Sequence, residues 1–308
     1  MSQVSPRRGT GLVLLAATCW ATLGLFGKQL YRYEVDPLVL VSLRAAIATL
    51  TLGLALAVFR PQWLRIRIWD LPFFAIFGVV GVAMNYASYF LALKWTTMTT
   101  TVILFYSYPF LVVLGATVLL KEPLTASKLV ALALSLVGLV LVAEAYDLAR
   151  LDLNRPGVVY SLLAAVATAS YNLLGKKSLA RYSSWTTLFY ALLFGAVSLL
   201  LWQGPRLYEA WEYPTPVWGL ILGLAWIPTL LGYAAFLLGL ADLEAGKASI
   251  VAYAELVIAV VLAYIFLGER LSPPQIVGGL LILAALFILQ FRTRLDGGRE
   301  VGMRQETI

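Results

Sequence analysis

Long apolar segments, each about the length of a membrane span, alternate along this chain with short polar joints. A helix needs roughly 20 mostly apolar residues to cross a hydrocarbon core of about 30 Å. The segments cover residues 10–30, 37–59, 71–94, 98–119, 125–144, 157–178, 184–203, 215–240, 246–267 and 274–292. The pattern therefore predicts ten transmembrane helices, and the fold class is an all-α polytopic membrane protein.

Several joints carry residues that start helices. Asp70 stands before Leu-Pro, Asn154 before Arg-Pro, and Ser272 before Pro-Pro-Gln. Asp, Asn and Ser side chains accept hydrogen bonds from the first free N–H groups of a helix, and proline suits its first turn. These joints predict helix starts close to residues 71, 155 and 273.

The composition is that of a membrane protein. Hydrophobic residues make up 61% and charged residues 13% of the chain, against roughly 45–50% and about 25% in soluble domains. The chain holds no histidine and one cysteine, Cys19. This excludes a histidine metal site, a Ser-His-Asp triad, a Cys-His pair and an intrachain disulfide. We therefore predict no enzyme activity, no cofactor and no metal site.

The net charge of +7 comes from basic residues in the joints and tails. In a membrane protein such residues usually set the orientation, so nucleic acid is not an expected partner. With a cytoplasmic N-terminus, the inside segments hold about twice as many Lys and Arg residues as the outside joints. This predicts a multi-pass protein of the cell (inner) membrane with both termini cytoplasmic.

The chain consists of two similar halves. Residues 106–124, "YSYPFLVVLGATVLLKEPL", align without gaps with residues 253–271, "YAELVIAVVLAYIFLGERL", at an offset of 147. The segments 86–93 and 233–240 match at the same offset. Because each half has five helices, an odd number, the second half starts on the opposite side of the membrane. Inverted repeats of this kind are the architecture of many secondary transporters, with the substrate site near the midplane.

The joints and last helices of both halves resemble a known family. "LLKEPLTASKLVALALSLVGLVLV" and "FLGERLSPPQIVGGLLILAALFIL" each join a Glu-containing loop to a Gly-bearing helix. With Trp20 in the first helix and Arg44 in the second, they resemble the ten-helix EamA-type exporters of the drug/metabolite transporter superfamily. The resemblance covers residues 12–143 and 157–291. It implies a central cavity lined mainly by the first, third, fourth, sixth, eighth and ninth helices, and export of amino acids, related metabolites or drugs.

The predicted function is a secondary active or facilitative exporter that works by alternating access around a midplane cavity. A lipid flippase or multidrug exporter stays open as an alternative, and an intramembrane enzyme is a disfavoured alternative of another class. Expected partners are a small-molecule substrate and the lipid bilayer, with protons and a monomeric or homodimeric state left open. The predicted parts are a cytoplasmic N-terminal tail (1–9), a first EamA-like repeat (10–144), an extracytoplasmic linker (145–156), a second EamA-like repeat (157–292) and a cytoplasmic C-terminal tail (293–308).

Glu255 is the acidic residue that stands clearly within a span, about 13 Å from the inner edge at roughly 1.5 Å per residue. An ionised carboxylate there costs at least about 2.5–3.5 kcal/mol, so it is expected to face the bundle interior, a partner or water. Its role is left open between binding a substrate amine, carrying a proton and a structural hydrogen bond. Arg44 is expected to support the structure by an interhelical contact, and a pairing with Glu255 is left open.

Other candidates are polar or aromatic residues at mid-span. Tyr86 and Tyr89 are three residues apart, and Trp226 and Tyr233 are seven apart, so each pair shares a helix face. Glu122 and Glu269, which match between the repeats, are expected to organise helix ends. The full set of predicted cavity residues is Trp20, Asn85, Tyr86, Tyr89, Tyr106, Tyr108, Tyr171, Asn172, Trp226, Tyr233, Tyr253 and Glu255.

Two prolines are structural or gating candidates. Pro109 in the fourth helix and Pro228 in the eighth each remove a helical hydrogen bond, which allows the helix to bend. The EamA-type exporters, which this chain resembles, often have a proline after the glutamate of the ninth helix, where this chain has Leu256. The sequence therefore predicts a bend in the fourth helix and gives no proline to bend the ninth.

Overall fold

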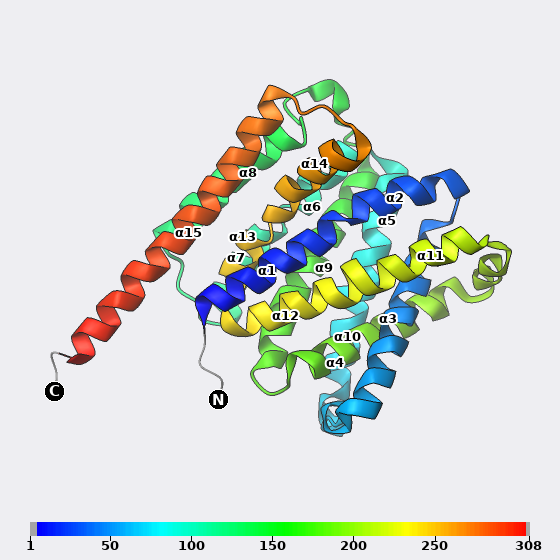
Figure 1. Ribbon diagram of the computed structural model, residues 1–308, viewed down its shortest axis with the longest axis horizontal. Helices are drawn as coiled ribbons and strands as arrows, with labels where there is room; N and C mark the ends of the chain where they lie inside the picture. Colours follow the sequence, from blue (N-terminus) through cyan, green and yellow to red (C-terminus); the bar gives the residue numbers. More distant parts are fainter. Residues whose placement is uncertain (1–4, 306–308) are drawn as a thin grey trace.

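The computed structural model describes residues 5–305, with side chains for residues 5–30 and 32–290. The first half contains α1 (Pro6–Ala21), α2 (Leu23–Leu30), α3 (Pro37–Phe59), α4 (Leu71–Gly78), α5 (Asn85–Trp95), α6 (Met98–Phe105), α7 (Tyr108–Leu119) and α8 (Ala126–Val142). The second half contains α9 (Arg155–Leu179), α10 (Ser184–Gln203), α11 (Thr215–Leu224), α12 (Gly232–Asp242), α13 (Ala245–Val251), α14 (Ala254–Leu267) and α15 (Pro273–Gln305). Figure 1 shows their arrangement.

These helices form ten spans and confirm the predicted all-α polytopic fold. Among the described residues, nine continuous or nearly continuous helical segments are long and apolar enough to cross a membrane, and α8 supplies a shorter one of 17 residues. Several spans consist of two helices in sequence: α1 with α2, α4 with α5, α6 with α7, α11 with α12, and α13 with α14.

The predicted tails are partly helical. α1 begins at Pro6 and α15 continues to Gln305, so residues 6–9 and 293–305 extend the first and last helices. The reason is that apolar residues mark where a helix lies in the membrane, and a helix can continue beyond that point with polar residues. Residues 1–4 and 306–308 of the predicted tails lie outside the described part.

Two of the three predicted helix starts use the expected side chain. Ser272 and Gln275 bond each other reciprocally, with the Ser272 N–H 3.0 Å from the Gln275 Oε1 and the Gln275 N–H 3.4 Å from the Ser272 Oγ. Asn154 accepts the Gly157 N–H at 3.5 Å. Asp70 does not cap α4, because its backbone is helical where a capping residue is usually extended; its side chain accepts instead from the hydroxyl of Tyr182 at 2.5 Å.

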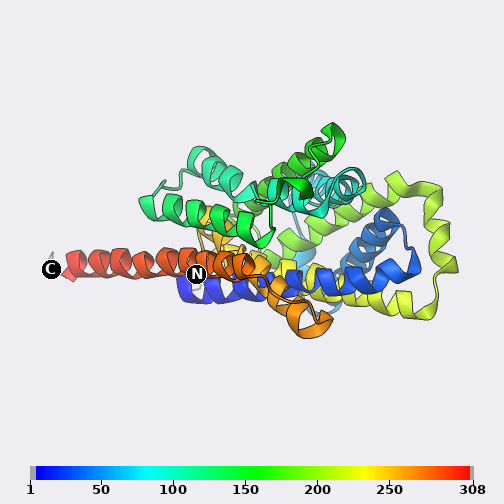
Figure 2. The ribbon, with the colours of Figure 1, turned by 90° about the horizontal axis from the view of Figure 1, so that it is seen from above.

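Several contacts between a helix of the first half and a helix of the second half have a counterpart between the matching helices of the opposite halves. α1 packs against α12 and α9 packs against α5; α14 packs against α1 and α7 packs against α9. The second span, α3, pairs with the seventh, α10, and α8 pairs with α15. Figure 2 shows α8 and α15 side by side, with α15 extending beyond the rest of the bundle. These matched pairs are those of the predicted repeats.

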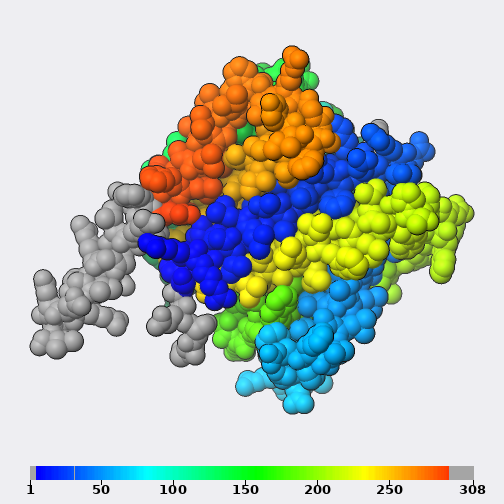
Figure 3. Space-filling model, viewed as in Figure 1, coloured from blue at the N-terminus to red at the C-terminus, as the bar shows by residue number. Residues whose placement is uncertain are grey.

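Small residues permit the closest of these contacts. A Cβ at Gly138 of α8 would lie 2.6 Å from the carbonyl oxygen of Gly278 in α15. The two helix backbones therefore touch, as in other helix pairs within membranes. Large apolar residues such as Leu54 and Phe59, 67% and 77% exposed, lie on the outside, where lipid would cover them. Figure 3 shows α1 crossing one face of the molecule between α14 and the α11–α12 span.

Candidate functional site

Two of the ten spans are broken in the middle, at positions that match between the repeats. Tyr106 and Ser107 separate α6 from α7 in the fourth span, and Ala252 and Tyr253 separate α13 from α14 in the ninth. Tyr106 and Tyr253 are the residues that the repeat aligns. The first break agrees with the prediction, because Pro109 in the first turn of α7 has no N–H with which to continue the helical ladder.

The ninth span breaks without a proline, which the sequence did not predict. The chain makes tight i to i−3 bonds here, from the Tyr253 N–H to the Ile250 carbonyl at 3.1 Å and from the Glu255 N–H to the Ala252 carbonyl at 3.0 Å. The Tyr253 hydroxyl donates to the Tyr106 carbonyl at 2.5 Å, and the two rings stack with centroids 5.9 Å apart. A contact between the two breaks therefore takes the place of a proline.

The third and eighth spans each contain a π-helical segment at matched positions, η4 (Val79–Met84) and η7 (Ala225–Leu231). A π-helix bonds residue i to residue i+5, and such segments often occur at functional sites. In η7 the Thr229 hydroxyl donates to the Leu224 carbonyl at 2.8 Å, and Pro228 lies within the segment. The third and eighth spans therefore depart from regular α-helix at the same level in each repeat.

The π-helical segment η7 changes which residues share a face. The prediction that Trp226 and Tyr233 lie on one face assumed a regular helix between them. In the structure Tyr233 packs in the interior against Trp20, with ring centroids 5.3 Å apart. Trp226 is 48% exposed and donates through its Nε1 to the Thr51 hydroxyl at 3.2 Å. The two residues do not share a face, because η7 adds residues to the turns between them.

Glu255 lies in the first turn of α14, directly after the break, and is partly buried. Its carboxyl group interacts with the hydroxyls of Tyr89, Tyr106 and Tyr108, and Tyr106 is a hydrogen-bond partner. We call these residues, together with Tyr253, the Glu255 cluster. Since the N-terminus of a helix carries partial positive charge, α14 supports a negative charge at this point.

A second group of predicted residues surrounds Tyr233 of α12. Its ring lies 5.3 Å from Trp20, 5.1 Å from Tyr171 and 6.3 Å from Tyr86, measured between centroids. The guanidinium carbon of Arg44 lies 4.1 Å from the centroid of the Tyr86 ring. We call these five residues the Arg44 cluster. They come from α1, α3, α5, α9 and α12.

The two clusters are separate but adjacent. Arg44 contacts the Tyr86 ring and, among the described side chains, forms no ion pair, so it is not paired with Glu255. Tyr86 and Tyr89 lie one turn apart on α5, roughly 4.5 Å along its axis. One belongs to each cluster, so α5 connects the buried cation Arg44 to the partly buried acid Glu255.

The two predicted asparagines both hydrogen-bond to Thr168 of α9, Asn85 from α5 and Asn172 from α9 itself. The Asn85 amide donates to the Thr168 hydroxyl and, at 3.4 Å, to the Ala164 carbonyl. Asn172 donates to the Thr168 carbonyl at 2.8 Å, and its side-chain oxygen has no partner. Asn85 therefore fixes the position of α5, on which Tyr86 and Tyr89 stand.

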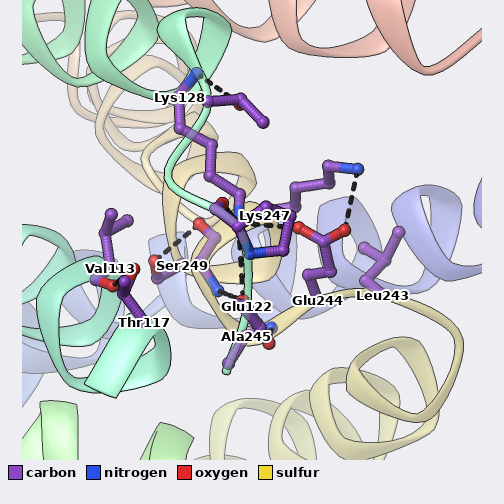
Figure 4. Close-up of polar contacts among 12 residues, drawn as sticks. Val113, Thr117, Glu122, Lys128, Leu243, Glu244, Ala245, Lys247 and Ser249 are labelled. Carbon is purple, nitrogen blue, oxygen red and sulfur yellow. Dashed lines mark hydrogen bonds and ion pairs between the residues drawn. The ribbon is translucent and has the colours of Figure 1, made fainter. Parts of the chain in front are cut away.

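An ion-pair cluster closes one end of the broken spans (Figure 4). Lys128, at the start of α8, is 1% exposed, and its ammonium group lies 2.7 Å from Glu244 and 3.6 Å from Glu122. Glu122 also accepts the N–H groups of Ala245 and Gly246 at 2.6 and 3.1 Å. We call Glu122, Lys128 and Glu244 the Lys128 cluster. Glu122 thus organises a helix end, as predicted, by capping α13 of the other repeat.

The charges of this cluster shift one pKa. Burial alone raises the pKa of Glu244, but the hydrogen bond to Lys128 and the nearby charge of Lys247 outweigh burial and hold the pKa below its ordinary value of 4.5. Glu244 is therefore ionised near neutral pH. The burial of Lys128 was not predicted, although the repeat offered a signal, since Lys128 aligns with the neutral Gln275.

The opposite end of the molecule lacks an equivalent contact. Glu269, the counterpart of Glu122, lies 3.3 Å from Lys28, with both side chains more than half exposed. α13 packs closely against α7, whereas its counterpart α6 has no contact of that extent with α14. Among the described elements, the two repeats therefore differ at their ends. At one end α13 and α7 are held together beside the Lys128 cluster, and at the other end their counterparts α6 and α14 are apart.

A shallow apolar groove lies beside the Glu255 cluster. It has a volume of about 300 Å³ and is lined by α1, α14 and α15, including Leu14, Ala254 and Val257. Ala254 and Val257 flank Glu255 in sequence. Among the described residues, no group of three His, Cys, Asp or Glu side chains has the arrangement of a metal site.

Comparisons with known proteins agree with this architecture. The model of the "EamA-like transporter family" matches residues 7–143 and 155–291. A "Probable terminal-alkyne amino-acid exporter" of Streptantibioticus cattleyicolor is 28% identical over 91% of this chain and 93% of its own length. An "Uncharacterized transporter" of Archaeoglobus fulgidus is 29% identical over 70% of this chain and 73% of its own. A solved crystal structure shares the fold, with a TM-score of 0.81 over 94% of this chain and 99% of that chain at 20% identity.

Proposed function

The chain belongs to the EamA-like transporter family, and from this we propose that it is a secondary exporter of small organic metabolites that works by alternating access. The observation that carries the proposal is the pair of matched breaks in the fourth and ninth spans, joined by the contact between Tyr106 and Tyr253. In transporters built from inverted repeats, broken helices at the repeat interface hold the substrate and the coupling ion. The relative named as an amino-acid exporter supports the substrate class.

Glu255 is the proposed coupling residue. It holds either a proton or the cationic amine of the substrate, and the two compete for one carboxyl group. Its position supports this role, because it stands next to the break, beside three tyrosine hydroxyls and at a helix N-terminus. Binding of a proton on one side of the membrane then displaces the substrate, which couples export to the proton gradient.

The proposed orientation has the N-terminus and the Lys128 cluster on the cytoplasmic side of the inner membrane. The excess of Lys and Arg in the inside segments supports it. In this orientation the described state is closed towards the cytoplasm and parted towards the outside. The cytoplasm-facing state follows by exchange of the repeats: Glu269 leaves Lys28 and caps α6 at Met98 and Thr99, and Glu122 releases α13.

The repeat exchange predicts two mutually exclusive cross-links. A Cβ at Gly246 would lie 3.2 Å from the Cγ2 of Val113, which is close enough for a disulfide in the described state. The counterpart pair, by the offset of 147, is Thr99 and Val260. In a Cys19→Ala background, Val113→Cys with Gly246→Cys should cross-link in resting protein, and Thr99→Cys with Val260→Cys only in the opposite state.

Mass spectrometry after mild oxidation measures both cross-links. Each should lock the protein and abolish transport, and reduction should restore it. A Thr99–Val260 pair that never cross-links under any substrate or pH condition, while the Val113–Gly246 pair is permanently linked without loss of transport, would contradict the exchange. Both pairs leave Glu122 and Glu269 in place. A Cβ at Gly246 would lie 3.5 Å from the Glu122 Oε2 and the Lys128 Nζ, so Gly246→Cys alone, without its partner cysteine, is the control for an effect on this end contact.

Transport in proteoliposomes tests the function directly. Vesicles loaded with a panel of labelled amino acids, monocarboxylates and primary amines should release at least one of them faster with wild-type protein than with empty vesicles. An imposed pH gradient should change the rate and the final level, because proton and substrate compete for Glu255. Fluorescent phospholipids in the same vesicles test the flippase alternative, and movement of lipid without movement of any solute would replace the proposal.

A further inference from the structure

Arg44 is a buried cation that forms no ion pair with any side chain the structure describes. It is 7% exposed and stands eight residues into α3, about 12 Å from the start of the helix at roughly 1.5 Å per residue. No ion pair forms with it among the described side chains, and its Nε has no hydrogen-bond partner. Because the guanidinium lies over the Tyr86 ring in the interior, the side chain does not reach for the membrane surface.

The contact with Tyr86 does not balance this burial. A cation over an aromatic ring contributes about 0.5–2 kcal/mol, whereas an arginine at the centre of a span costs at least about 2.5–3.5 kcal/mol. A buried charge is normally paired or fully hydrogen-bonded. The site as described therefore lacks a negatively charged group.

Other donors in the same cluster are also unused. The hydroxyl of Tyr171, which is 3% exposed, and the Nε1 of Trp20 have no hydrogen-bond partner among the described residues. The hydroxyl of Tyr86, also 3% exposed, has another neutral hydroxyl, that of Tyr233, as its hydrogen-bond partner. Tyr233 lies among them, close enough to Arg44, Tyr86 and Tyr171 for electrostatic interaction with each. Buried hydroxyls are rarely left unpaired in native proteins. A cation beside a free O–H donor and a free N–H donor is what an anion requires.

We propose that the Arg44 cluster is a carboxylate-binding subsite, in which Arg44 and the hydroxyls of Tyr86 and Tyr171 hold the carboxylate of the substrate. The inference rests on the proposed export function and specifies its substrate class. The aromatic rings of Trp20 and Tyr233 cover the apolar part of the ligand. Glu255, reached along α5 through Tyr89, takes a cationic group where the substrate has one, so carboxylates and zwitterions bind, and the matching neutral amides do not.

The test compares two probes of the same shape, 3-phenylpropionate and 3-phenylpropanamide. Binding to the purified protein is measured by the rise in its unfolding temperature with probe concentration. Wild-type protein should bind the acid at least about tenfold more tightly than the amide, since a hydrogen-bonded charge pair is worth that or more. Arg44→Gln should bind the two probes equally.

Tyr171→Phe is the sharper variant. It removes a hydroxyl that has no hydrogen-bond partner in the described part of the chain, so the unfolding temperature without probe should stay the same or rise. Binding of the acid should nevertheless fall by about fivefold or more, as expected for the loss of a hydrogen bond to a charged group. If Arg44→Gln does not fold, Tyr171→Phe decides alone.

Two matched controls separate binding from folding. The Tyr190 hydroxyl donates to the Leu64 carbonyl at 2.7 Å, so Tyr190→Phe should lower stability and leave the preference for the acid unchanged. Arg155 is exposed, and Arg155→Gln should change neither the stability of the protein nor its preference for the acid. A wild-type protein that binds amide as well as acid, or a Tyr171→Phe variant with unaltered binding, overturns the subsite and leaves the exporter proposal intact. A protein that binds neither probe and transports nothing in the panel overturns both.

Discussion

Replacing Glu255 by glutamine should reduce the proposed proton-driven transport by at least about tenfold. Glutamine keeps the size of the side chain and an oxygen that can accept from Tyr106, but it can neither bind a proton nor attract a cationic amine. Hydrogen bonds to charged groups are worth about 1.5–3 kcal/mol, which corresponds to tenfold or more in affinity. The transport of an amine-bearing substrate should therefore become slow, and what remains should no longer respond to an imposed pH gradient.

The measurement is efflux from proteoliposomes across a range of external pH, with equal amounts of each protein. Glu212→Gln is the control, because Glu212 is an exposed acid far from both clusters in sequence, and it should transport as wild-type protein does. The unfolding temperature of Glu255→Gln should not fall, since a neutral amide is less costly to bury than a carboxylate. Wild-type transport and wild-type pH dependence in this variant would remove Glu255 from the mechanism and leave it a structural hydrogen-bond partner.

The spans were predictable from the sequence because a membrane imposes a simple rule on composition. Each apolar run had to be a helix, and the bounds of α3 and α7 follow from Pro37 and from the polar joint after Leu119. The inverted repeat followed from an alignment of the sequence with itself. The exact helix ends outside the membrane, at Pro6 and in α15, carried no such signal.

The site was less predictable, because its geometry depends on contacts between distant residues. The break at Tyr253 has no local cause comparable to Pro109, and arises from a hydrogen bond to Tyr106, 147 residues away. The π-helical turns in η7 shift the phase of the eighth span, so spacing alone placed Trp226 on the wrong side of the helix relative to Tyr233. Residue types indicated which side chains could belong to a site, whereas the sequence did not show which face of the helix a residue takes after an irregular turn.

The charged residues show the same limit. The sequence marked Arg44 and Glu255 as unusual because each is expensive within a span. It could not show that they belong to two different clusters, since that depends on how α3, α5 and α14 pack. Apart from the neutral Gln275 at its matched position, nothing in the sequence warned of the burial of Lys128, because it stands near a helix start where a lysine is ordinarily exposed. Its burial is set by Glu122 and by Glu244 of the other repeat.

Replacing Lys128 by methionine should destabilise the protein by about 3–5 kcal/mol, because it leaves the buried carboxylate of Glu122 and the half-buried carboxylate of Glu244 without their shared cation. The loss should depend on pH. In the wild-type protein the pKa of Glu244 is held below its ordinary value of 4.5, so its contribution to stability is present above that value and is lost as pH falls through the lowered pKa. The variant lacks the part of this contribution that Lys128 makes, while Lys247 still lies 3.3 Å from Glu244. The difference between the two proteins should therefore be largest near pH 7 and shrink towards pH 4.

Thermal unfolding in detergent from pH 7 to pH 4 measures this difference. Lys121, an exposed lysine in the same loop, supplies the control, and Lys121→Met should stay within about 0.5 kcal/mol of wild type. Adding Glu122→Gln to Lys128→Met should regain part of the loss, because the carboxylate left without a cation is removed while an acceptor for the Ala245 N–H remains. A difference that stays constant over the whole pH range would show that Lys128 acts through packing of its aliphatic chain, and that its charge does not hold the two repeats together at this end.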